Sequence, residues 1–127
     1  MRLFLVRHAE AAPGEPDELR PLTPAGRAAA RDLGERLARE HPTAVVSSPL
    51  LRARETADQI ARAADLTPEA DERLAPGASV SDLQAAFADR GGTVIAIGHQ
   101  PDCSAIYLVL TGQEADFAPG TAREVEL

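Results

Sequence analysis

The sequence contains no lysine and no tryptophan, and it has a single cysteine among its 127 residues. All thirteen basic residues are therefore arginines, so any cationic site must be built from guanidinium groups or histidines. Cys103 has no partner for an internal disulfide, and this fits a reducing compartment.

Long apolar runs are also missing, since no stretch approaches the roughly 18 residues that a membrane-spanning helix needs. The chain starts MRLFLVRHAE, and its apolar run is too short for the core of a signal peptide. We therefore expect a cytoplasmic protein that does not contact a membrane.

Aromatic residues make up only 3% of the chain, and the formal net charge is -7. A nucleic-acid-binding protein needs a basic surface for the phosphate backbone, and a single-strand binder also needs aromatic side chains for base stacking. We therefore expect no nucleic acid among the partners.

Apolar strands alternate with helical segments along the chain, which predicts one domain over residues 1–127. The expected strands cover residues 3–6, 43–47, 66–70, 93–97 and 121–127, and the expected helices cover 24–40, 48–64, 80–89 and 102–110. This order predicts a three-layer α/β/α sandwich with a mostly parallel central sheet.

The first expected helix has clear boundary signals. Thr23 is a hydroxyl cap followed by Pro24, and His41-Pro42 stops the helix. An inner stripe is expected at Ala29, Ala30, Leu33 and Leu37, with Gly34 as a weak point.

Candidate site residues follow three of the expected strands, at the edge of a parallel sheet where ligands bind. Arg7 and His8 follow the first strand, Arg52 lies shortly after the second, and His99 follows the fourth. Each residue alone also fits a structural or surface role. Two arginines and two histidines together, however, would repel one another unless they bind an anion, so their convergence predicts an anion site.

Phosphate is the natural ligand, because guanidinium forks bind its oxygens in pairs. Neighbouring arginines would keep His8 neutral and able to attack phosphorus, giving a phosphohistidine. His99, if protonated in the complex, would donate to the phosphate oxygens. Metal binding is the rival use of the histidines, but arginines oppose a divalent ion, so we expect no metal and no cofactor.

The residues around these positions resemble the signature motifs of the histidine phosphatase superfamily. The matching segments are LVRHAE at 5–10, RPLTPAG at 20–26, SSPLLRARETA at 47–57 and IGHQPD at 97–102. The resemblance implies a phosphoglycerate mutase-like fold, with His8 as the phosphoryl acceptor and His99 as the second histidine. It also makes Arg7 and Arg52 phosphate ligands.

The short chain and the RPLT and GHQPD segments are most similar to the SixA-like branch of this family. That branch acts on phosphohistidine in signalling proteins, so the resemblance implies a histidine-containing phosphotransfer domain as partner. Arg20 lies in the loop after His8 and is a candidate substrate-binding residue, although a surface role among acidic neighbours is equally open.

Two positions depart from the family pattern. Ala9 replaces the usual glycine, which requires a negative φ there. Pro76 stands where many relatives have a catalytic glutamate, and nearby Glu72 fits a surface carboxylate better than a proton donor. An alkoxide leaving group gains much from an acid, whereas the imidazole of phosphohistidine depends on one far less.

Phosphohistidine on a protein is therefore the expected substrate. Two alternatives remain open at this point: a small phosphorylated metabolite as substrate of a phosphomonoesterase, and a noncatalytic phosphate-binding module. An intact His8 argues against the second, because a binder needs no nucleophile.

Overall fold

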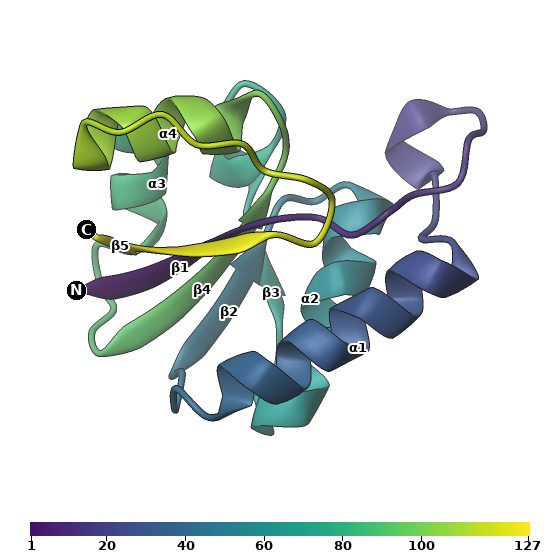
Figure 1. The fold of residues 1–127 in the computed structure, drawn as a ribbon, viewed down its shortest axis with the longest axis horizontal. Coiled ribbons are helices and arrows are strands. Elements are labelled where there is room, and N and C mark those ends of the chain that lie inside the picture. The colour runs from purple at the N-terminus through teal and green to yellow at the C-terminus, as the bar shows by residue number, and fades with distance from the viewer.

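A five-stranded sheet forms the centre of the protein in the computed structural model, which describes residues 1–127 (Figure 1). Its strands are β1 (Arg2–Arg7), β2 (Ala44–Ser47), β3 (Glu69–Ala70), β4 (Thr93–Gly98) and β5 (Ala122–Glu126). They lie in the order β3-β2-β4-β1-β5, and all neighbours are parallel except β1 and β5, which are antiparallel. The mostly parallel sheet expected from the sequence is confirmed.

Helices cover both faces of this sheet. They are α1 (Pro24–Ala38), α2 (Leu51–Ala64), α3 (Val80–Ala86) and α4 (Asp102–Thr111), with short 3₁₀ turns η1 (Asp17–Leu19) and η2 (Glu72–Leu74) in two of the loops. Figure 1 shows α1 and α2 on one side of the sheet and α3 and α4 on the other. The three-layer α/β/α sandwich is thus also confirmed. No helix is long and apolar enough to cross a membrane.

The central strands are apolar at successive positions because both of their faces are covered. In β1, Leu3 and Leu5 belong to the core that includes α3 and α4, while Phe4 and Val6 belong to the core under α1 and α2. Alternate side chains of a strand point to opposite faces, so a continuous apolar run fills two cores.

α1 begins as expected, since the side chain of Thr23 accepts a hydrogen bond from the backbone N–H of Gly26. The helix ends at Ala38, two residues before the expected end, with Arg39 at its C-terminus. Ala29 was wrongly placed on the inner stripe: it is exposed, because the buried stripe runs through Gly26, Ala30, Leu33, Gly34 and Leu37.

The second helix begins later than the sequence indicated, at Leu51 instead of Ser48. The backbone N–H of Ser48 still donates to the carbonyl of Ile97, as an extension of the β2–β4 pairing. Its hydroxyl accepts from the N–H of Leu50 and so holds a turn before the helix. The three residues from Ser48 to Leu50 therefore connect strand and helix without being helical. α3 likewise ends at Ala86, earlier than expected.

Candidate active site

His8 and His99 lie side by side at the carboxyl edge of the sheet. Parallel pairing aligns Arg7, the last residue of β1, with Gly98, the last residue of β4. The residue that follows each strand is a histidine, so the two histidines leave the sheet next to each other. The centroids of the two imidazole rings are 5.2 Å apart, with the ring planes inclined by 58°. Both side chains are buried, at 8% and 4% relative exposure.

The hydrogen bonding of His8 fixes which ring nitrogen carries the proton. Its Nδ1 lies 2.7 Å from the carbonyl oxygen of Ala9, and a carbonyl oxygen only accepts hydrogen bonds. Nδ1 is therefore the protonated nitrogen of the neutral ring, and Nε2 keeps a free lone pair. A histidine in this tautomer is prepared to act as a nucleophile.

A chain of buried hydrogen bonds holds the turn that follows His8. The backbone N–H of Ala9 donates to the hydroxyl of Thr56 at 3.0 Å, and that hydroxyl donates to the carbonyl of Arg52 at 2.8 Å. Among residues other than glycine, only His41 and Asp65 have positive φ. The backbone of Ala9 therefore meets the requirement for alanine in place of the usual glycine.

Burial and nearby cations keep both histidines neutral. Burial is the main cause that lowers the pKa of His8, and the charges of Arg52 and Arg7 lower it further, against the opposing bond to Ala9. The pKa of His99 falls to about 4, again mainly through burial and then through His8 and Arg52. The arginines do lower the pKa of both histidines, as expected from the sequence, but desolvation lowers it more. His99 Nε2 also lies 2.8 Å from the hydroxyl of Ser48.

The guanidinium of Arg52 is buried and is held by the loop that follows His8. Its Nη1 donates to the backbone carbonyl of Asp17 at 2.9 Å, and its Nη2 to the carboxylate of the same residue at 3.2 Å. Arg20 binds the other carboxylate oxygen of Asp17 at 3.0 Å, and its Nε donates to the carbonyl of Ala12. Arg20 therefore lies beside the site, joined to Arg52 through one carboxylate.

Asp17 is the site residue that the sequence motifs did not single out. The local signal for it is modest: an acidic residue three positions before Arg20, in a loop that also contains Glu18. Its side chain is 61% exposed, and hydrogen bonds from Arg20 and Arg52 lower the pKa of the carboxyl group. Asp17 is thus ionised and accepts hydrogen bonds at this site.

Arg7 is the last residue of β1, and its charge lowers the pKa of both histidine rings. Its Nη1 donates to the carbonyl of Phe117 at 3.0 Å, and its Nε is buried with no hydrogen-bond partner. A buried donor without a partner is costly, which distinguishes Nε of Arg7 from the hydrogen-bonded Nη1.

Glu72 takes no part in this cluster. It lies in η2, is exposed, and forms neither an ion pair nor a side-chain hydrogen bond with the histidines or arginines of the site. Pro76 is exposed in the same loop. No group of three or more His, Cys, Asp or Glu side chains is arranged to hold a metal ion.

The family model of the histidine phosphatase superfamily, branch 1, matches residues 3–76, which is more than half of the chain. The chain belongs to this superfamily. The matched segment contains Arg7, His8 and Arg52, while His99 lies beyond it in the fourth strand–helix unit.

Proteins similar to this chain support the family and the fold. The protein histidine phosphatase SixA, in complex with tungstate, superimposes with a TM-score of 0.88 and 28% identity, covering 100% of this chain and 88% of SixA. An uncharacterized protein from Picosynechococcus sp. is 36% identical over 113 residues, covering 80% of this chain and 68% of that protein. A phosphoglycerate mutase from Bacillus anthracis shares the fold alone, at 15% identity with a TM-score of 0.78, covering 98% of this chain and 86% of the mutase.

Proposed function

We propose that this protein is a phosphatase that forms a phosphohistidine intermediate on His8 and removes phosphate from phosphohistidine of a signalling protein. The observation that carries the proposal is the hydrogen bond from Nδ1 of His8 to the carbonyl of Ala9. It leaves the Nε2 lone pair free in a pocket whose other groups, Arg7, Arg52 and His99, suit a phosphoryl group.

In the first step, Nε2 of His8 attacks phosphorus, and the bond between phosphorus and the leaving atom breaks. Arg7 and Arg52 offset the charge on the phosphoryl oxygens, because guanidinium groups stay protonated and bind oxygens in pairs. Nδ1 keeps its proton and its bond to Ala9, which stabilises the positive charge that develops on the attacking ring.

In the second step, water attacks the phosphorus of phosphohistidine 8, and the P–Nε2 bond breaks to return neutral His8 and inorganic phosphate. His99 lies next to the reacting ring and is neutral in the empty site. A bound phosphate dianion beside His99 favours the protonated ring. In the complex, a protonated ring nitrogen of His99 would therefore donate a hydrogen bond to an equatorial oxygen of the phosphoryl group.

The missing proton donor supports phosphohistidine as substrate. Asp17 is the carboxylate at the site, and its lowered pKa makes it a poor acid. The leaving group of a phosphohistidine is an imidazole whose other ring nitrogen has a free lone pair. This nitrogen takes up a proton from solvent before the P–N bond breaks, so the imidazole departs as a neutral molecule. An alkoxide departing from a sugar phosphate has no such route and gains much from a general acid.

Two further observations support a protein as the phosphate carrier. The loop beside the site has exposed side chains, with Asp17 at 61% and Leu19 at 56% relative exposure, that a protein partner can contact. SixA, described as a protein histidine phosphatase, covers this chain completely. A histidine-containing phosphotransfer domain is therefore the proposed partner.

A substrate panel tests the proposal against its rivals. Purified protein is assayed on a phosphorylated histidine-containing domain, on p-nitrophenyl phosphate and on several metabolite esters. We expect the phosphodomain to give the highest kcat/KM. Rapid turnover of one metabolite ester with none of the phosphodomain would instead establish a small-molecule phosphomonoesterase.

Trapping the intermediate tests the nucleophile. Brief reaction with a phosphate-labelled substrate followed by a denaturing quench should leave acid-labile phosphate on the wild-type protein and none on His8→Ala. The activity of that variant should fall by at least about 1,000-fold, since a nucleophile is removed. Binding of phosphate with neither label nor turnover in the wild type would indicate a noncatalytic module.

A further inference from the structure

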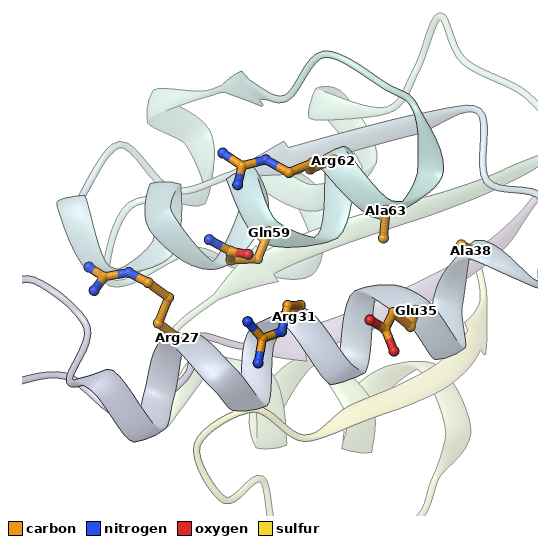
Figure 2. Close-up of a pocket in the computed structure, with 7 residues that line it drawn as sticks. All are labelled: Arg27, Arg31, Glu35, Ala38, Gln59, Arg62 and Ala63. Atoms are coloured by element: carbon orange, nitrogen blue, oxygen red, sulfur yellow. The ribbon is translucent and has the colours of Figure 1, made fainter.

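A groove separate from the active site runs between α1 and α2 (Figure 2). Its volume is about 630 Å³. It is lined by Arg27, Arg31, Glu35 and Ala38 of α1 and by Gln59, Arg62 and Ala63 of α2. Close packing of the two helices forms its floor, because Gly34 of α1 lies directly against the backbone of Ile60.

The groove is cationic on a protein of net charge -7. Three arginines line it against one glutamate. Arg31 and Arg62 take part in none of the ion pairs of the structure, although Glu35 and Asp58 lie one helical turn from them. Both arginines are exposed, so their charges are available to an anionic partner.

Figure 2 shows how the side chains lie along the groove. Arg62 extends from α2 toward the end of the groove where Arg27 lies, and the amide of Gln59 lies between them. Arg31 follows Arg27 one turn later on α1. Donors from both helices thus gather in one half of the groove, and Glu35, Ala38 and Ala63 line the other half.

The cationic half of the groove is connected to the active site. Arg27 pairs with Glu55 at 3.3 Å, and the other carboxylate oxygen of Glu55 accepts the N–H of Leu22 at 2.8 Å. Leu22 closes the loop that carries Arg20. On α2, Arg52 and Arg62 are ten residues apart, which corresponds to about 15 Å along the helix.

The chemistry of the groove favours one kind of occupant. Exposed arginines hold a free ion weakly, whereas a ligand already anchored nearby meets them at a high effective concentration. Guanidinium groups bind carboxylates in pairs. A substrate segment anchored in the active site beside Arg52 would cover the distance of about 15 Å to Arg62 with about five extended residues or ten helical ones.

We infer that this groove docks an acidic segment of the same protein whose phosphohistidine enters the active site. The inference rests on the proposed function, since it takes a phosphorylated protein as the substrate. Docking lowers KM for that substrate and leaves the chemical step at His8 unchanged.

Matched peptides test the inference. Two histidine peptides are phosphorylated chemically; one has glutamates on both flanks at the spacing that reaches the groove, and the other has glutamines at those positions. They are assayed at low ionic strength with wild type, with Arg31→Gln/Arg62→Gln, and with Arg36→Gln. Arg36 is the control because it is exposed on α1 and lies outside the groove.

We expect the wild type and Arg36→Gln to prefer the glutamate peptide by about tenfold in kcat/KM, through KM, since several charge pairs near an anchored ligand act together. Arg31→Gln/Arg62→Gln should lose this preference and still hydrolyse the glutamine peptide and p-nitrophenyl phosphate at wild-type rates. Added salt should abolish the preference of the wild type.

Equal rates on both peptides with the wild type would overturn the docking inference alone. The same conclusion would follow if the preference survived in the double variant or disappeared in Arg36→Gln. If the wild type hydrolysed neither phosphohistidine peptide but did hydrolyse p-nitrophenyl phosphate, the proposed function would be wrong, and docking of such a substrate with it.

Discussion

At the scale of single residues, the site depends on how a few polar groups are held. His8 keeps its proton on Nδ1 because a carbonyl oxygen lies 2.7 Å away, and Arg52 is held by both the backbone and the carboxylate of Asp17. The carboxylate of Asp17 accepts from a guanidinium nitrogen of Arg52 that, in the proposed mechanism, binds phosphate. It therefore competes with the ligand while its backbone carbonyl orients the same arginine.

Replacing Asp17 with asparagine separates these two effects. The backbone bond to Arg52 does not depend on the side chain, so the arginine stays in place while a negative charge beside the anion site is removed. We expect Asp17→Asn to bind inorganic phosphate about three- to tenfold more tightly, as measured by competitive inhibition. Glu18→Gln, an exposed neighbour outside the ion pairs, serves as the control. Weaker phosphate binding by Asp17→Asn would mean that the carboxylate is needed to position Arg52.

At the scale of elements, the close contact between α1 and α2 decides the role of Gly34. Helix propensity alone marks this glycine as a defect of α1. In the structure, a Cβ atom at Gly34 would lie 2.9 Å from both the carbonyl oxygen of Gln59 and the Cα of Ile60. The absence of a side chain therefore lets the helices pack directly on each other, beneath the arginine groove.

The contact predicts that adding a methyl group at Gly34 destabilises the protein at least as much as removing one from an exposed position of α1. Gly34→Ala should lower the free energy of unfolding by about 1–3 kcal/mol, because the methyl group meets backbone that cannot move aside cheaply. Ala29→Gly, at an exposed position of the same helix, should cost only about 1 kcal/mol through propensity. Urea denaturation of both variants measures this. A stabilised Gly34→Ala would show that the helices separate without cost.

At the scale of the whole molecule, two buried neutral histidines make stability depend on pH. The pKa of His99 is lowered to about 4, and the pKa of His8 is lowered as well, from 6.5 in both cases. At pH values below 6.5 and above the lowered pKa of each histidine, the unfolded chain binds protons that the folded chain does not. The contribution of the histidines to stability is therefore complete above pH 6.5 and is lost as the pH falls.

We expect the free energy of unfolding to be about 2 kcal/mol lower at pH 5 than at pH 7, as measured in urea. The carboxylates with lowered pKa act below pH 4.5 and leave this window to the histidines. His8→Gln/His99→Gln should lose most of the difference, whereas His41→Gln, changed at an exposed histidine, is the matched control. An unchanged slope in the double variant would assign the pH effect to other groups.

Local sequence determined the order of strands and helices, the first residue of three of the four helices, and the position of each histidine directly after a strand. Apolar runs identify strands that are buried on both faces, and the cap at Thr23 fixes the start of α1, because these signals act between neighbours in the chain. Parallel pairing then places the residues after β1 and β4 at one edge. These local rules place both histidines at one edge of the sheet, whereas their approach to each other depends on β1 and β4 being neighbouring strands.

Only the tertiary structure decided which groups hold the site and where the second cationic surface lies. Asp17 reaches Arg52 across 35 positions, and Ser48 reaches His99 across 51. The arginine groove likewise exists only because α1 and α2 pack side by side. No periodicity or capping rule specifies such contacts, since they depend on how whole elements pack against the sheet. This packing buries His8 and His99 and lowers their pKa, and it brings to Asp17 the arginines whose hydrogen bonds lower the pKa of its carboxyl group.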